Sequence, residues 1–295
     1  MRFILPINRS FNVLFFRFRS VEQVIIENPI INSPFTEPQR HFRFGEDGIT
    51  NDIIEQRRTS QYFIPIAKPK KKDKQIQLEL DLGSWTQDRI EENKFINDIR
   101  ILVSSWRRGG YRGHGNITPI TRRLLEHWTN PERERRLFFC QIEALETAIY
   151  IAEVAKISGD TWIKNNLNKF KDDANPLLFR LALKLATGTG KTVVMSMLIA
   201  WHSLNKIANP QRREFSDTFL VVAPGITIRD RLRVIQPNDP ENYYKKLDLV
   251  PADLLPDLEK AKIVITNYHA FQLREHTNVG KLTKKLLYCI AFYYC

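Results

Sequence analysis

Hydrophobic and polar positions follow two different periods in the N-terminal part of the chain. Residues 75–82, QIQLELDL, place an apolar side chain at every second position, which is typical of a half-buried strand. Residues 88–106 repeat apolar side chains at helical spacing, and we expect a helix there. Residues 21–74 keep no helical period and are rich in Pro, Asn and Arg. They indicate extended arms and loops, with a solvated basic linker at 68–74.

A long helix is expected from residue 130 to about residue 155. Asn130 can accept the first free backbone N–H groups as an N-cap, and Pro131 suits the first helical position. Glu132 and Glu134 then favour the positive end of the helix dipole.

The rest of the chain alternates between strand and helix patterns. We expect strands at 177–186, 218–223 and 262–266, and helices at 191–206, 226–235 and 268–275. Alternation of this kind favours a parallel sheet with helical crossovers, so the expected fold class is α/β.

Composition adds one hint about a partner and excludes several classes of protein. The 295 residues are 43% hydrophobic and carry a formal net charge of +12. This surplus favours a polyanionic partner such as nucleic acid, although many basic proteins bind none. The three cysteines form no CxxC pair, and no apolar run approaches the roughly 20 residues of a membrane span. We therefore expect a cytoplasmic protein without a membrane partner.

The stretch LATGTGKT, residues 185–192, joins a predicted strand to a predicted helix through a glycine-containing loop. Gly188 and Gly190 let the backbone curl so that its N–H groups face a phosphate. Lys191 can reach the β- and γ-phosphates, and the Thr192 hydroxyl can bind Mg²⁺. The candidate residues for ATP binding are Thr187, Gly188, Thr189, Gly190, Lys191 and Thr192. Lys191 and Thr192 are also the candidate catalytic residues, and Thr192 is the candidate metal ligand.

The loop lacks the first glycine of the usual pattern, because Leu185 occupies that position. The variant ATGTGKT resembles motif I of superfamily-two helicases and translocases, in particular the motor subunits of type I and type III restriction enzymes and their DEAD/DEAH-box relatives. The resemblance implies a partial RecA-like domain at 136–295, preceded by an α+β accessory region at 75–135 and an extended N-terminal arm and basic linker at 1–74. It covers roughly residues 21–280.

Three further stretches extend the resemblance. FFCQIEALETAIY is similar to the segment with which these motors read adenine, which implies that role for Gln141; a surface glutamine is the alternative. FLVVAPGITIRDRLRVI resembles motif Ia of the type III restriction motor, and IVITNYHAF resembles the segment after the next strand. The residues implied to bind nucleic acid are Pro224, Gly225, Thr227, Arg229, Thr266 and Asn267. For the arginines, a solvated amphipathic helix is the alternative.

One expected element is missing from the sequence. The motors of these families carry an Asp-Glu-x-His or Asp-Glu-x-Asp motif, and no Asp of this chain is followed by Glu. We therefore expect a domain truncated before the acidic motif, which binds ATP and DNA but hydrolyses ATP poorly alone. The resemblance also implies a methyltransferase or specificity subunit, or a downstream chain with the rest of the motor, as partners.

Two other functional classes stay open. One is a non-enzymatic, nucleotide-dependent DNA-binding module completed by a second polypeptide. The other is a P-loop enzyme that is not a motor, such as a kinase. The basic stretch RRGGYRG, residues 107–113, also has two interpretations. Its arginines and Tyr111 could contact nucleic acid, but a mobile surface loop is the interpretation we prefer.

Overall fold

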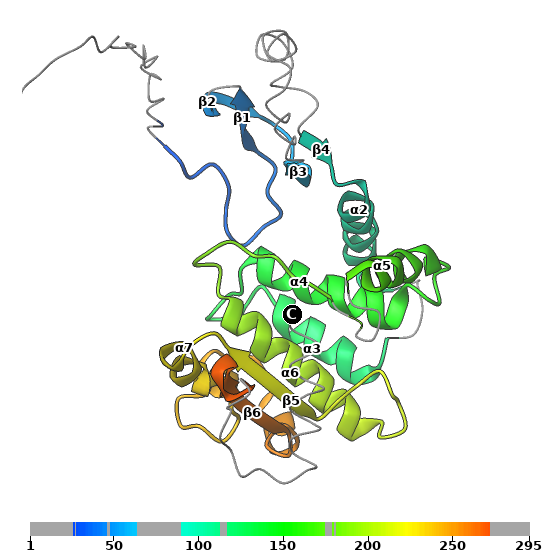
Figure 1. Cartoon of the computed structure of the whole chain (residues 1–295), viewed down its shortest axis with the longest axis vertical. Helices are drawn as coiled ribbons and strands as arrows, with labels where there is room; N and C mark the ends of the chain where they lie inside the picture. The colour runs from blue at the N-terminus through cyan, green and yellow to red at the C-terminus, as the bar shows by residue number, and fades with distance from the viewer. Residues whose placement is uncertain are drawn as a thin grey trace, which may run out of the picture. The chain divides into compact units, whose positions relative to one another are not determined.

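The computed structural model describes residue 26 and residues 28–45, 48–63, 90–112, 117–174, 179 and 181–271. The chain divides into two compact units. The first comprises Met1–Asn32 and Pro38–Arg58, and the second comprises Ser33–Glu37 and Thr59–Cys295 (Figure 1). The described part of the accessory region therefore belongs to the same unit as the glycine-rich loop. The strand expected at 75–82 lies outside the described residues.

The first unit contains an antiparallel hairpin of β1 (His41–Gly45) and β2 (Gly48–Ile54). The expectation of arms and loops alone across residues 21–74 was therefore wrong for this part. Phe42 lies opposite Ile53 across the ladder. Such cross-strand apolar pairs stabilise a hairpin. The strands are short and flanked by Pro, Asn and Arg residues, so the sequence pattern did not predict them.

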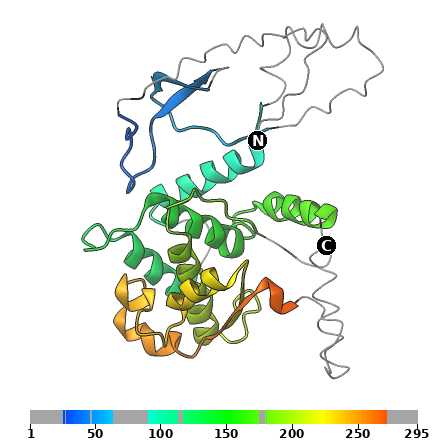
Figure 2. The ribbon, with the colours of Figure 1, turned by 60° about the vertical axis from the view of Figure 1, so that its left-hand side comes forward.

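The second unit is built mainly from helices. They are α2 (Lys94–Arg108), α3 (Pro119–Thr129), α4 (Phe139–Ile149), the π-helical turn η1 (Tyr150–Val154), α5 (Thr161–Ala174) and α6 (Lys191–Ala208). A short antiparallel pair, β3 (Gln61–Phe63) and β4 (Ile90–Glu92), precedes them. Helix α6 is central, because it contacts α3 and α4 and buries Met197, Trp201 and Leu204 (Figure 2). The helix expected at 191–206 is confirmed. The helix expected at 88–106 forms only from Lys94, and its start was wrong, because residues 90–92 form strand β4 with β3 instead.

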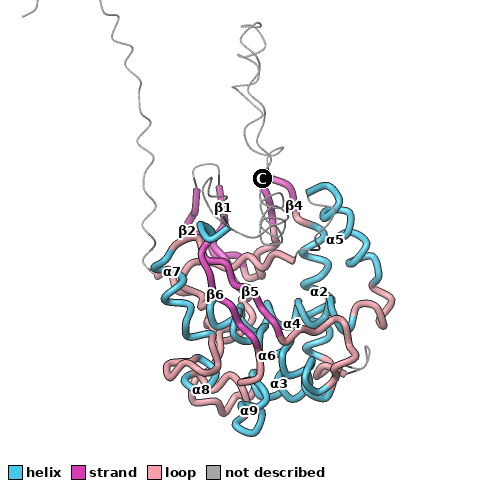
Figure 3. The backbone as a smooth tube through the Cα atoms, turned by 60° about the horizontal axis from the view of Figure 1, so that its bottom comes forward, coloured by secondary structure: helices cyan, strands magenta, loops and turns pink. Residues whose placement is uncertain are grey.

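A small parallel sheet packs beside α6. Its strands are β5 (Thr218–Ala223) and β6 (Lys262–Asn267), which lie next to each other in Figure 3. Short elements connect and follow them: α7 (Ile226–Arg231), η2 (Leu232–Ile235), α8 (Tyr243–Lys246), η3 (Ala252–Leu254), α9 (Leu255–Leu258) and η4 (Tyr268–Phe271). Both strands, their parallel pairing and the intervening helix were expected from the sequence, and the mixed α/β content is confirmed.

The long helix expected at 130–155 was wrong at its start. Asn130 does not begin a helix: it is the C-cap of α3, and α4 starts after an intervening turn. Arg133 explains the difference, because its guanidinium donates to the carbonyls of His127 at 3.1 Å and Asp248 at 2.6 Å. These contacts hold the turn against a distant loop, and they outweigh the local capping signal.

The strand expected at 177–186 was also wrong over its described part. Residues 181–186 form no strand, and the described strands β5 and β6 pair with each other. A strand is defined by its ladder, so an apolar alternating sequence without a neighbouring strand does not become one.

A buried polar cluster joins α3, η1 and α6. Glu153 accepts hydrogen bonds from Thr121 Oγ1 at 2.7 Å and from Trp201 Nε1 at 2.9 Å. Its other carboxylate oxygen accepts from the Thr118 N–H at 2.9 Å. Asn205 Nδ2 donates to Thr121 Oγ1 at 3.0 Å. All five residues are buried, so these bonds satisfy groups that water cannot reach and fix how the three elements meet.

Candidate nucleotide-binding site

The glycine-rich loop turns sharply before α6. Gly188 and Gly190 have φ angles of 83° and 76°, a left-handed conformation that residues with a Cβ rarely adopt. Gly190 is the residue that caps the N-terminus of α6. A Cβ on Gly188 would meet nothing within 4 Å, so the backbone there is open to a ligand. The two glycines thus place the loop and the first turn of α6 around one open face, as a phosphate requires.

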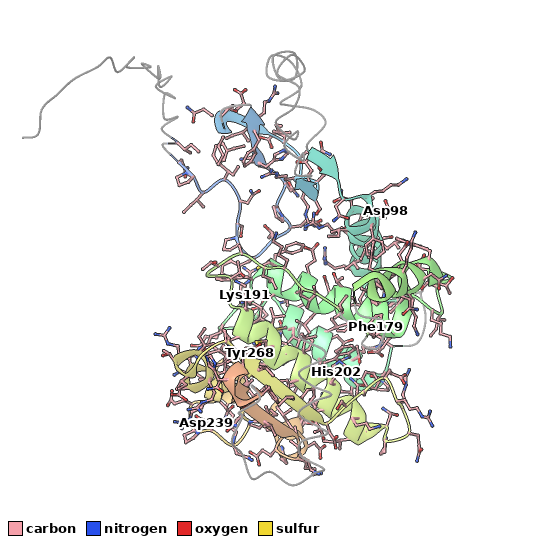
Figure 4. All side chains as sticks on the ribbon, in the orientation of Figure 1. Asp98, Phe179, Lys191, His202, Asp239 and Tyr268 are labelled. Carbon is pink, nitrogen blue, oxygen red and sulfur yellow. The ribbon has the colours of Figure 1, made fainter. Side chains whose placement is uncertain are left out.

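Lys191 stands at the start of α6, where Figure 4 labels it. Its Nζ donates to the Ala186 carbonyl at 2.8 Å, and Thr189 Oγ1 donates to the same oxygen at 2.8 Å. Lys191 and Thr187 are exposed. The lysine therefore folds back over the loop and can exchange one carbonyl for the stronger acceptor that a phosphate provides.

Thr192 follows Lys191 in the first turn of α6 and is partly exposed. Its carbonyl accepts from Ser196 Oγ at 3.0 Å, which is an ordinary bond within the helix. The chemistry of the donors fits a magnesium nucleotide, because the loop and the start of α6 together carry a hydroxyl, an ammonium and backbone N–H groups. Among the described residues, no group of three His, Cys, Asp or Glu side chains could hold a metal ion.

Gln141 connects α4 to this loop. Its side chain is buried, and Nε2 donates to the Thr189 carbonyl at 2.9 Å. Its Oε1 accepts from the Phe138 N–H at 3.0 Å and so satisfies a free donor at the start of α4. The alternative of a surface glutamine is wrong. The amide nevertheless serves the loop and its own helix in this structure, and reading of adenine remains a proposal.

The residues expected to bind nucleic acid gather at one edge of the sheet. β5 and β6 are parallel and end at the same level, with Ala223 opposite Asn267. The residues at and just beyond these strand ends therefore lie side by side. Thr266 and Asn267 are the last two residues of β6, and β5 is followed by Pro224, Gly225, Thr227 and Arg229. Two of these side chains already have partners: Arg229 Nη2 donates to Asp230 Oδ1 at 2.8 Å, and Asn267 Oδ1 accepts from the Ala270 N–H at 3.0 Å.

The glycine-rich basic stretch at the end of α2 is exposed at Arg108, Gly109, Gly110 and Arg112, as a surface loop requires, and its mobility stays a prediction. Its aromatic side chain is the exception. Tyr111 is buried, with a φ of 58°, and its hydroxyl donates to Glu146 at 2.6 Å. Trp106 is buried beside it, at a ring distance of 5.0 Å. Neither aromatic ring is available to stack on a base. Residues 113–116 lie outside the described part of the chain.

Of three comparisons with known proteins, one found a match. The family model for the res subunit of type III restriction enzymes matches residues 140–290, just over half of the 295 residues. Searches of the curated proteins and of the solved structures gave no match. Within the described residues, no helix is long and apolar enough to cross a membrane. Since the matched range begins beside Gln141 and contains the whole glycine-rich loop with α6, β5 and β6, the chain belongs to the family of type III restriction enzyme res subunits.

Proposed function

We propose that this chain is part of an ATP-dependent DNA helicase or translocase of a restriction-type system. Membership of the res family indicates helicase-like, ATP-dependent activity, and proteins of this family generally use ATP and Mg²⁺. The observation that supports the proposal best is the loop before α6, with two left-handed glycines, an exposed Lys191 and a backbone held by Gln141. We propose the RecA-like fold for this domain, of which β5, β6 and α6 would be parts.

In this proposal, Thr187–Thr192 bind the triphosphate. The loop N–H groups and the N-terminus of α6 stabilise its negative charge, and Lys191 neutralises the outer phosphates. Thr192 would hold Mg²⁺ through its hydroxyl, and the ion would supply positive charge beside the phosphates. Gln141 would read the base or shape the loop that holds the phosphates, and its hydrogen bond to the Thr189 carbonyl supports the second role.

DNA would bind at the carboxyl ends of β5 and β6. The short connection at 209–217 joins the end of α6 to the start of β5, so the N-terminus of α6 lies toward the carboxyl end of the strand. The nucleotide loop and the segments after β5 and β6 therefore share one side of the domain. This arrangement would let DNA contacts respond to the bound nucleotide.

We also propose that the chain alone hydrolyses ATP poorly, because no Asp-Glu pair is present to hold the metal-bound water and polarise the attacking water. Steady-state ATPase measurements with and without DNA test this part. Robust turnover stimulated by DNA would contradict it.

Binding of a fluorescent ATP analogue with Mg²⁺ tests the central part of the proposal. We expect the wild-type chain to bind and Lys191→Ala to lose at least about tenfold in affinity, because it loses charge-assisted bonds to phosphate. Lys164→Ala is the matched control, since Lys164 is an exposed lysine on α5. Equal binding by wild type, Lys191→Ala and the control, or no binding by a folded wild-type chain, would overturn the proposal.

A further inference from the structure

Arg107 of α2 binds Glu146 of α4 in a buried ion pair. The Arg107 Nε lies 2.8 Å and the Nη2 2.6 Å from Glu146 Oε2. Tyr111 donates to the other oxygen of this carboxylate. Glu146 has no exposed area, and Arg107 is mostly covered. A buried carboxylate that loses such a partner is left without compensation, so the pair strongly fixes the distance between the two helices.

The same guanidinium reaches a short N-terminal segment, Ser33–Glu37. Arg107 Nη1 lies 3.3 Å from Glu37 Oε2. The guanidinium carbon also lies 4.7 Å from the centre of the Phe139 ring, at the first residue of α4. Arg107 therefore contacts Ser33–Glu37 and two turns of α4 at once.

Ser33–Glu37 also contacts the start of α4 directly. The Phe139 N–H donates to the Pro34 carbonyl at 2.8 Å, which satisfies one of the free donors of the helix. The rings of Phe35 and Phe138 lie 5.7 Å apart. The N-terminus of α4 is thus held by a segment about a hundred residues away in the sequence, although no local signal predicts the contact.

This held end of α4 is the end that touches the nucleotide loop. Gln141 follows Phe139 in the first turn of α4 and donates to the Thr189 carbonyl. Helix α4 contacts α2 on one side and α6 on the other (Figure 1). A rigid helix transmits a displacement along its length, so the position of Gln141 depends on what holds α4.

We propose that Arg107 is a positioning residue of the nucleotide site. Together with Glu37 it fixes α4, and α4 in turn presses Gln141 against the glycine-rich loop and keeps the loop in its phosphate-binding shape. The proposal rests on the proposed nucleotide binding. It assigns the accessory part of the chain a role in ATP affinity that neither the loop motif nor the family match contains.

A double-mutant cycle tests whether Arg107 acts through Gln141. Arg107→Lys removes the planar fork but keeps the charge, and Glu37→Gln removes one charge at a half-exposed position. Each is made in the full chain and in the Gln141→Ala background, and the affinity and stoichiometry of fluorescent ATP with Mg²⁺ are measured by titration. We expect each variant to weaken binding roughly 3- to 10-fold with unchanged stoichiometry, and less than about 2-fold when Gln141 is already Ala.

A purely structural role would give a different result. It would lower the number of binding sites per chain and leave the affinity of the folded molecules unchanged, or it would weaken binding by the same factor in both backgrounds. Either result overturns the proposal. Glu37→Gln decides the question alone if Arg107→Lys does not fold.

The controls separate this proposal from the proposed function. Arg123→Lys disrupts an exposed two-bond pair, with Asp253 at 2.6 and 2.7 Å, and should leave ATP affinity unchanged. If wild type binds and Lys191→Ala does not, while Arg107→Lys and Glu37→Gln bind as wild type, only the positioning role fails. If the folded wild-type chain binds no nucleotide, both fail.

Discussion

Gln141 Nε2 donates a hydrogen bond to the Thr189 carbonyl at 2.9 Å, although the two residues lie 48 positions apart. The bond joins the first turn of α4 to the glycine-rich loop. Gly190 allows this approach, because a Cβ there would collide with Gln141 Nε2. Gly190 is thus required for two reasons: its backbone is left-handed, and a side chain there would occupy the space of the Gln141 amide.

Gly190→Ala should therefore damage the nucleotide site. The new Cβ must displace the Gln141 side chain, which is held by two hydrogen bonds. An alanine at position 190 would also be strained, because the backbone there has a φ of 76°. We expect the affinity for fluorescent ATP to fall at least about tenfold. Gly159→Ala is the matched control, because Gly159 has a φ of 84° and its Cβ would meet nothing within 4 Å. That variant should lose roughly 1 kcal/mol of stability and no ATP affinity. Wild-type binding by Gly190→Ala would contradict the role of this contact.

Glu153→Ala should destabilise the fold without touching the nucleotide site. It leaves two buried donors, the Thr118 N–H and the Thr121 hydroxyl, without their acceptor, whereas Trp201 Nε1 keeps Thr121 Oγ1 at 3.0 Å. An unsatisfied buried group costs about 1–3 kcal/mol, so we expect a loss of about 2 kcal/mol or more in the free energy of unfolding in urea. Glu241→Ala, which removes an exposed glutamate, should cost about 1 kcal/mol at most. If Glu153→Ala loses no more free energy of unfolding than Glu241→Ala does, the buried polar cluster contributes little to stability.

His202 should make the stability depend on pH. Its ring packs beside Trp201 and Phe215, and its Nδ1 is a buried atom with no hydrogen-bond partner. Burial lowers the pKa of His202 below its ordinary value of 6.5. The unfolded chain therefore takes up the proton first, so this contribution to stability is complete above about pH 6.5 and falls as pH drops toward the folded pKa.

His202→Phe should remove this dependence. The unfolding free energy, measured in urea between pH 8 and pH 5, should fall less steeply for the variant than for wild type. At pH 8 the variant should be at least as stable, because an unpaired buried nitrogen is replaced by carbon. The control is His269→Phe, which replaces an exposed histidine. Parallel curves for wild type and His202→Phe would show that the ring does not titrate in this range.

Arg229→Gln should weaken DNA binding and reduce its salt dependence. Arg229 lies after β5, at the sheet edge where we propose that DNA binds, and it must exchange Asp230 for a phosphate. We expect a loss of about threefold in affinity for a fluorescent duplex and a decrease of about 1 in the slope of log K against log salt. Arg43→Gln, which removes an exposed arginine of the first unit, should leave the slope unchanged. An unchanged slope for Arg229→Gln would remove this residue from the interface.

The local elements of the site could be predicted because their chemistry is contained in short stretches. LATGTGKT specifies two left-handed glycines and a helix start, and the structure has both at Gly188 and Gly190. Short continuous apolar runs at 218–223 and 262–266 predict strands, and both form. The family followed from the same motifs, since their order and spacing along the chain carry the resemblance.

Contacts between distant residues were decided by the tertiary structure alone. Asn130 has the chemistry of an N-cap, yet carbonyls far along the chain bind Arg133 and make Asn130 the end of α3. Tyr111 belongs to a glycine-rich basic stretch that suggests exposure, yet Glu146 draws its hydroxyl into the core. A sequence pattern reports the preference of a few neighbouring residues. It cannot report which remote donor or acceptor will satisfy them, because that depends on packing across the whole unit.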